Sequence, residues 1–112
     1  MDFNADKPIF LQIADTVCDR ILQGILKGEE RIPSVREFGA EIGVNPNTVM
    51  RTYEKLTADG IIYNKRGIGY FVAPDAKENI LNSQRKEFLG KDVPAIRKRL
   101  ELLGLDASIF NQ

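Results

Sequence analysis

The chain has 112 residues, and its 16 lysines and arginines balance its 16 aspartates and glutamates. This length fits one compact domain with a short appendage. The zero net charge does not by itself indicate a nucleic-acid partner, because nucleic-acid-binding domains are usually basic. With no histidine and one cysteine, Cys18, the chain has no Ser-His-Asp or Cys-His triad and no histidine zinc site. We therefore expect no enzyme, no metal and no cofactor.

The lone cysteine also excludes an internal disulfide and fits a reducing compartment. No stretch approaches the roughly 20 consecutive apolar residues that a membrane-spanning helix needs. Residues 1–7 contain two aspartates and lack the apolar core of a secretory signal. We expect a cytoplasmic protein with no membrane partner.

A first amphipathic helix is predicted to begin at Pro8, because proline is favoured at the first helical position. Apolar residues then recur every four positions and form one stripe: Ile9, Ile13, Val17, Ile21 and Ile25. Cys18 lies at the edge of this stripe, where we expect it to pack as a small hydrophobic residue.

A second helix is predicted from a capping box. In this motif the Ser34 side chain accepts a hydrogen bond from the Glu37 amide, and the Glu37 side chain accepts one from the Ser34 amide. Apolar positions 35, 38, 39 and 42 form its buried face, and Gly43 ends it in the left-handed conformation. Gly39 lies inside that face, where it costs about 1 kcal/mol relative to alanine. Close approach of another helix would explain it.

A third helix follows after a two-residue turn. Asn45 is a good N-cap for the amide of Thr48, and Pro46 takes the first helical position. Positions 49, 53 and 56 form the inward stripe, so Asn47 and Arg51 point the opposite way. Two short helices joined by a glycine-containing turn predict a helix-turn-helix.

A short β-hairpin is predicted next, with strands over residues 61–64 and 70–72 and a basic loop that carries Lys65 and Arg66. Three helices followed by a basic hairpin make a winged helix-turn-helix. The fold class is therefore mainly α with a small β-hairpin. We expect a DNA-binding domain over residues 1–74 and a helical tail over residues 75–112.

The tail is predicted to form two helices, with a break at Gly90 and a restart at Pro94. Its apolar stripe needs a partner, and a second copy is the simplest one. We expect dimerisation through Ile80, Phe88, Val93, Ile96, Leu100 and Leu103. Two short helices supply too little wall for a ligand pocket of about 300–1,000 Å³. A small-molecule effector stays open at this point, and the sequence identifies none.

The predicted shape fits duplex DNA, whose major groove admits a helix with its side chains. The first turn of the recognition helix reads base edges in helix-turn-helix proteins. Asn47 suits adenine, Arg51 suits guanine or phosphate, and Thr48 suits either kind of contact. We expect a phosphate contact from Arg36. At the hairpin tip, Lys65 and Arg66 are expected either to contact phosphate or to enter the minor groove. Taken singly, these residues are also explained by capping or by a solvated surface.

The chain also resembles a known family of bacterial regulators. IPSVRE at residues 32–37, GVNPNTV at 43–49, YEKL at 53–56 and RGIGYFV at 66–72 look like the GntR-family DNA-binding domain. The NPNTV version with a short tail looks like the small YtrA-type branch. The likeness spans about residues 8–72.

This resemblance implies a regulator, a repressor by expectation, that binds a palindromic operator as a homodimer. It implies DNA contacts from Arg36, Asn47, Thr48, Arg66 and Gly67, with Asn45 a further candidate at the helix start. Larger relatives often carry arginine or serine where Pro46 stands and an arginine near Met50. We expect the neighbouring Arg51 to serve instead, so base preference cannot be copied from them.

The main alternative is a winged helix that binds a partner protein through its third helix and hairpin. Zero net charge supports that alternative, whereas the basic hairpin and the Asn47 and Arg51 face favour DNA.

Overall fold

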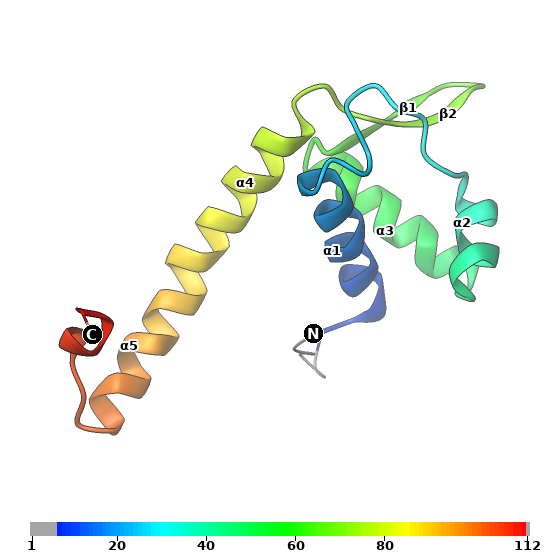
Figure 1. Ribbon diagram of the computed structural model, residues 1–112. Helices are drawn as coiled ribbons and strands as arrows, with labels where there is room; N and C mark the ends of the chain where they lie inside the picture. The colour runs from blue at the N-terminus through cyan, green and yellow to red at the C-terminus, as the bar shows by residue number, and fades with distance from the viewer. Residues whose placement is uncertain (1–6, 112) are drawn as a thin grey trace. The chain divides into compact units, whose positions relative to one another are not determined.

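The computed structural model describes residues 7–111. Its elements are α1 (Ile9–Leu22), α2 (Val35–Ile42), α3 (Pro46–Ala58), β1 (Ile62–Lys65), β2 (Gly69–Val72), α4 (Ala76–Glu87), a π-helical turn (Phe88–Asp92), α5 (Val93–Leu102) and a 3₁₀ turn (Ala107–Asn111) (Figure 1). The predicted fold class, mainly helical with one hairpin, is confirmed. The chain divides into two compact units, residues 1–80 and 81–112. No helix among residues 7–111 is both long and apolar enough to cross a bilayer.

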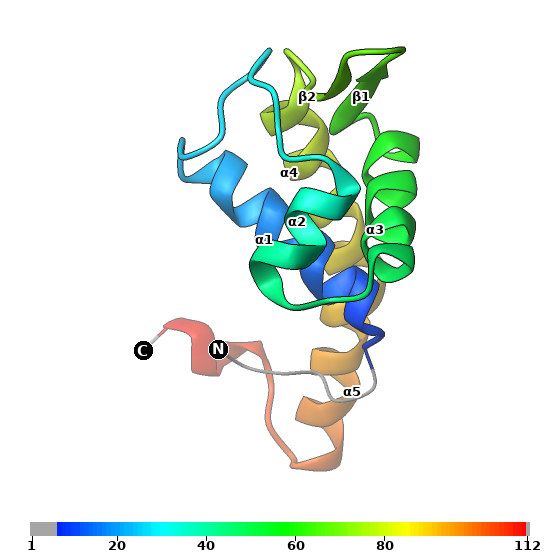
Figure 2. The ribbon, with the colours of Figure 1, turned by 90° about the vertical axis from the view of Figure 1, so that its right-hand side faces the viewer.

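The core of the N-terminal unit forms where α1 and α2 pack on α3 and where the hairpin closes one end (Figure 2). From the predicted α1 stripe, Ile13, Val17 and Ile21 are buried. Cys18 is buried as well, and burial together with nearby aspartates raises the pKa of its thiol to about 12. The thiol is therefore protonated at neutral pH and packs as an apolar side chain, as predicted.

Helix α1 differs from its prediction at both ends. Pro8 is the N-cap with an extended ψ of 147°, so the helix begins one residue later. At the other end Gly24 has a φ of 79°, and the Ile25 amide donates to the Arg20 carbonyl at 2.8 Å. This is a Schellman motif, which terminates the helix before Ile25. Ile25 is consequently exposed, and Ile9 at the other end of the helix is exposed as well. The assignment of these two residues to the buried stripe was wrong.

The start of α2 and the turn into α3 form as predicted. The Glu37 amide donates to the Ser34 hydroxyl at 3.1 Å, and the Ser34 amide donates to the Glu37 carboxylate at 2.9 Å. Gly43 is left-handed, with a φ of 70°. The Asn45 side chain caps α3, but it accepts from the Asn47 amide at 2.8 Å and not from that of Thr48.

Gly39 is needed because the backbone of the turn crosses it closely. A Cβ atom at this position would lie 2.7 Å from the Val44 carbonyl oxygen. The expected close approach is therefore present, but the neighbour is the turn that leads into α3 and not the body of another helix. The contact brings the start of α3 against α2, which sets the geometry of the helix-turn-helix.

Two hydroxyl groups on α3 bond to backbone elsewhere in the unit. The buried Thr52 hydroxyl donates to the Phe10 carbonyl at 2.8 Å, which joins α3 to the first turn of α1. The buried Tyr53 hydroxyl donates to the Pro33 carbonyl at 2.6 Å, which joins α3 to the segment before α2. Because their alternative is an unsatisfied buried polar group, these bonds fix where α3 sits.

The hairpin pairs Ile62 with Val72 at its base and Lys65 with Gly69 at its tip, in an antiparallel register. A third segment extends it: the Ile32 amide donates to the Tyr70 carbonyl at 3.0 Å, and Arg31 forms a bridge with Phe71. The sequence did not predict this pairing. It joins the segment before α2 to β2, which therefore lies between that segment and β1.

The C-terminal helices α4 and α5 are continuous through the π turn, so the break predicted at Gly90 does not occur. Gly90 is absent from the positive-φ glycines, and the residues flanking the turn are in the right-handed helical region. Pro94 cannot donate to the carbonyl four residues earlier, which belongs to Gly90 itself. A π turn absorbs such an interruption without ending the helix.

Candidate nucleic-acid interface

Three parts of the N-terminal unit carry the predicted DNA contacts: the start of α2, the start of α3 and the tip of the hairpin. Figure 2 shows α2 and α3 in front view with the hairpin above them. All three belong to one compact unit, and buried hydrogen bonds or strand pairing join each to its neighbours.

The first turn of α3 presents side chains that are free to bond outside the molecule. Asn47 is exposed and Thr48 is half-buried. Within residues 7–111 neither side chain makes an intramolecular hydrogen bond, whereas Val49 on the opposite side is fully buried. The Asn45 oxygen is already occupied as the cap, so this residue offers mainly its amide NH₂ group.

The second and third turns of α3 each carry a cation, Arg51 and Lys55, and the two differ in their surroundings. The Arg51 guanidinium lies 4.1 Å from the centroid of the Phe10 ring. Lys55 forms an ion pair with Asp59 at 2.9 Å, one turn further along the helix. Arg51 therefore keeps its hydrogen-bond donors available, while Lys55 is partly engaged by an acid of its own helix.

Arg36 is the second residue of α2 and is exposed beside the capping box. Hydrogen bonds from Ser34 lower the pKa of the neighbouring Glu37 carboxyl, and Arg31 lowers it further. Glu37 thus stays ionised at neutral pH, and its carboxylate accepts a hydrogen bond from the Ser34 amide at the start of the helix. Arg36 projects from the same turn as a free cation suited to phosphate.

The hairpin tip is a tight turn in which the Ile68 amide donates to the Lys65 carbonyl at 2.9 Å. Gly67 has a φ of 79°, as the third residue of a type II turn requires. Lys65 lies 4.8 Å from the centroid of the Phe71 ring, and Arg66 is exposed at the turn. The tip therefore presents cations on a short, backbone-exposed loop.

Sequence reasoning missed Arg31, which lies against the hairpin. Its Nε atom would be 3.0 Å from a Cβ built on Gly69, whose φ is 142°. Arg31 is exposed and adds a cation between the start of α2 and the hairpin. No local pattern could have indicated it, because its position depends on pairing between residues 40 positions apart.

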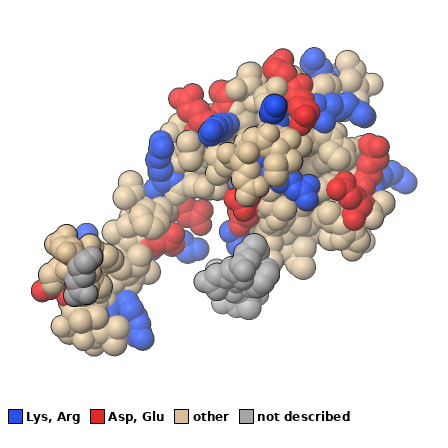
Figure 3. Space-filling view, viewed as in Figure 1, with Lys and Arg blue, Asp and Glu red and all other residues tan. Residues whose placement is uncertain are grey.

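Basic and acidic side chains are interspersed over the visible face of this unit (Figure 3). On this face the cations do not form one large basic patch. Binding to DNA would depend on individually placed cations and polar groups.

Comparison with known proteins identifies the family. The profile of the bacterial regulatory proteins of the gntR family matches residues 10–72, which span α1 to the end of the hairpin. The chain belongs to the GntR family. Its winged helix is accordingly a GntR DNA-binding domain.

Two relatives from Bacillus subtilis (strain 168) place the GntR chain near the small YtrA-type branch. It is 36% identical to the HTH-type transcriptional regulator YhcF over 92% of this chain and 84% of that protein. It is 33% identical to the HTH-type transcriptional repressor YtrA over 96% of this chain and 76% of that protein. These relatives are named as transcriptional regulators and not as enzymes.

Solved structures agree with this family. A GntR-family transcriptional regulator from Bacteroides thetaiotaomicron superposes with a TM-score of 0.80 at 46% identity, covering 93% of this chain and 90% of that one. The DNA-binding domain of AraR, solved in complex with operator ORR3, superposes with a TM-score of 0.58 at 26% identity. That match covers 65% of this chain and 88% of the AraR chain.

The predicted dimerisation residues of this GntR chain differ in their exposure. Phe88, Ile96 and Leu103 are exposed, and Val93 and Leu100 are half-buried. Ile80 is only 1% exposed, because it packs in the core of the N-terminal unit. Its side chain is therefore covered by its own chain, and we remove it from the dimerisation set.

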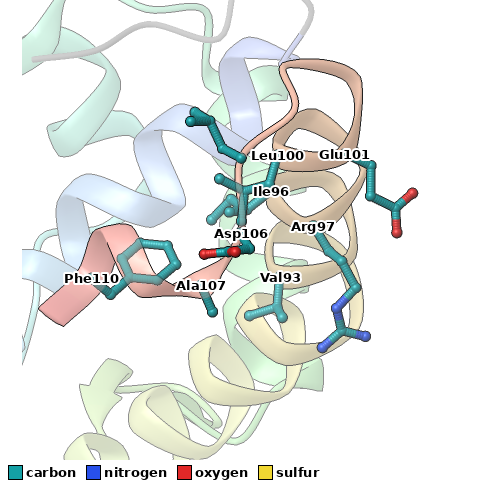
Figure 4. Close-up of a pocket in the computed structure, with 9 residues that line it drawn as sticks. Val93, Ile96, Arg97, Leu100, Glu101, Asp106, Ala107 and Phe110 are labelled. Carbon is teal, nitrogen blue, oxygen red and sulfur yellow. The ribbon is translucent and has the colours of Figure 1, made fainter.

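The C-terminal unit contains a hollow of about 350 Å³, lined mainly by apolar side chains (Figure 4). Gly104, with a φ of 67°, turns the chain back so that Phe110 faces the α5 residues Val93 and Ile96. The expectation that the tail lacks the wall for a pocket was therefore wrong. It overlooked the 3₁₀ turn, which supplies the second wall.

Proposed function

We propose that this GntR-family chain is a sequence-specific transcriptional repressor that binds a palindromic operator as a homodimer in the cytoplasm. The observation that carries the proposal is the first turn of α3. Asn47 and Thr48 stand there with no intramolecular side-chain hydrogen bond among residues 7–111, on a helix whose opposite face is buried. The repressor YtrA among its relatives supports the same direction of regulation.

We assign different roles to the contact residues. Asn47 and Arg51 lie four residues apart on the outward face of α3 and read base edges in the major groove. Arg36, Thr48, Lys65 and Arg66 hold phosphates on either side, and Gly67 lets the hairpin backbone approach the duplex. Asn45 contributes its NH₂ group while its oxygen caps the helix. The operator-bound AraR domain supports DNA as the partner of this face.

The dimer is proposed to form through residues 75–112, with residues 1–74 as the DNA-binding domain. Exposed apolar residues on the π turn, on α5 and at its C-cap favour self-association, among them Phe88, Ile96 and Leu103. A twofold dimer presents two recognition helices to two half-sites, which is why a palindrome is expected.

Fluorescence anisotropy with the DNA upstream of the chain's own gene tests the proposal. The purified chain is titrated into labelled duplex at near-physiological salt, with unlabelled random duplex as competitor. We expect tight binding that survives the competitor, since specific affinity typically exceeds non-specific affinity by about 10³-fold or more. Binding would then be narrowed to a palindrome by footprinting.

Other results have distinct meanings. Binding that random duplex abolishes would contradict specificity for this DNA, and selection from a random pool would then be used to search for another operator. No binding even at low salt would contradict the DNA-binding proposal. It would favour the alternative, a winged helix that contacts a protein, for which the zero net charge is the supporting observation.

A further inference from the structure

The contact between Arg51 and Phe10 links α1 to the outward face of the recognition helix. The guanidinium carbon of Arg51 lies over the Phe10 ring, 4.1 Å from its centroid. Phe10 belongs to the first turn of α1, 41 positions away along the chain. No sequence pattern connects the two residues.

The position of Phe10 is fixed by a separate contact. Its carbonyl accepts the hydrogen bond of the Thr52 hydroxyl at 2.8 Å, and Thr52 is fully buried. Thr52 directly follows Arg51 in α3. This bond therefore holds the Phe10 backbone, from which the ring extends, beside Arg51 independently of the ring contact.

The ring face leaves Arg51 able to bind DNA. A guanidinium has five N–H donors, and a ring face attracts its charge without acting as an ordinary hydrogen-bond acceptor. None of the ion pairs within residues 7–111 involves Arg51. A long arginine side chain loses rotamer freedom when it binds, and holding it beforehand reduces that loss.

We propose that Phe10 is a positioning residue for DNA recognition, because its ring holds the Arg51 guanidinium in the orientation that meets the duplex. The proposal rests on the proposed function and deepens it. Phe10 itself touches no DNA, so its effect passes through Arg51 alone. This requirement separates positioning from a general packing role.

A double-mutant cycle on the full chain tests the proposal by anisotropy with the operator fragment. Phe10→Leu removes the aromatic face, and Phe10→Tyr keeps it. We expect Phe10→Leu to weaken operator binding about two- to fivefold, the size of an exposed cation–π contact. Phe10→Tyr should bind like the wild type. In the Arg51→Ala background, Phe10→Leu should change the affinity no further.

Several outcomes would overturn the proposal. Phe10→Leu could bind as the wild type does, or bind more tightly, which would mean that the ring holds Arg51 away from DNA. An equal loss in the wild-type and Arg51→Ala backgrounds would show that Phe10 only packs α1, and circular dichroism would record the accompanying loss of stability. If the wild type itself fails to bind any DNA, the proposed function fails first and this inference fails with it.

Discussion

Asn47 and Arg66 are proposed to contact different parts of the duplex, and their substitutions should therefore differ in kind. Asn47→Ala removes a base-reading amide, so we expect a loss of roughly 1–3 kcal/mol on the operator and a weaker preference over random DNA. Arg66→Ala removes a phosphate contact and should weaken binding to both duplexes by a similar factor. Its salt dependence should become shallower because fewer counterions are released.

Anisotropy titrations of both variants at several salt concentrations, on operator and random duplex, measure this contrast. The two variants serve as controls for each other, since both side chains are exposed. Equal proportional losses on operator and random DNA for Asn47→Ala would refute the base-reading role.

Glu37 gives the N-terminal unit a pH-dependent contribution to stability. Its pKa in the folded state is lowered, first by the hydrogen bond from the Ser34 amide. The ionised form is therefore favoured by folding, and the contribution is present above the unfolded pKa of about 4.5. It is lost as the pH falls through the lower, folded-state pKa.

The variant Glu37→Gln isolates this contribution because glutamine keeps the capping-box geometry and does not titrate. We expect the wild type to be more stable than the variant at pH 7, with the gap closing as the pH falls below about 5. Urea unfolding followed by circular dichroism across that range measures the difference. A gap that stays constant with pH would contradict the assigned pKa direction.

A glycine-to-alanine substitution is expected to have opposite effects on stability in α2, at Gly39, and in the π turn, at Gly90. At Gly39 a methyl group would lie 2.7 Å from the Val44 carbonyl, so the turn must move. Overpacking of this kind costs about 1–3 kcal/mol, which exceeds the roughly 1 kcal/mol that alanine gains in helix propensity. We expect Gly39→Ala to be destabilising overall and to weaken DNA binding.

Gly90→Ala is the matched control, because no atom outside its chain neighbours and the local helix backbone lies within 4 Å of the added methyl group, and its φ is not positive. It should be neutral or stabilise the tail by up to about 1 kcal/mol. Thermal unfolding at one fixed protein concentration compares the two variants. A stabilised Gly39→Ala protein would mean that the turn has room to move.

Features that depend on neighbouring residues could be predicted from the sequence, whereas contacts between distant residues could not. The capping box at Ser34, the left-handed Gly43 and the start of α3 at Pro46 depend on residues within four positions, and all were predicted. The hydrogen bond from Tyr53 to Pro33 and the contact of Arg31 with Gly69 depend on residues far apart in the chain. No periodicity encodes such contacts. Gly90 and Pro94 together predict a break in the helix, because local patterns do not reveal a π turn.

At the scale of the whole molecule, the sequence predicted three elements for DNA contact, and the structure brings all three into one unit. It did not predict which tail residues are available to a partner. Ile80 has the same chemistry as Ile96, yet Ile80 is buried in the N-terminal unit and Ile96 is 42% exposed. Burial of that kind follows from the path of the chain after the hairpin, which no local pattern specifies.

Self-association should therefore depend on Ile96 and its neighbours on α5. Ile96→Glu places a charge on the apolar stripe, where burial against a second copy would desolvate it. We expect the wild type to sediment as a dimer at micromolar concentration and Ile96→Glu to sediment as a monomer. Because only a dimer engages both half-sites together, the variant should also lose affinity for the full palindrome while its affinity for a single half-site stays unchanged.

Lys98→Glu is the control, since Lys98 lies on the opposite side of α5 from the Val93, Ile96 and Leu100 stripe by helical geometry. It reverses a charge at an exposed position and should remain dimeric. Analytical ultracentrifugation of the wild type, Ile96→Glu and Lys98→Glu shows which side of α5 forms the dimer interface. A monomeric wild type would refute the dimer itself. A dimeric Ile96→Glu protein would instead show that the copies associate through another surface, and the half-site geometry would then have to be derived from that surface.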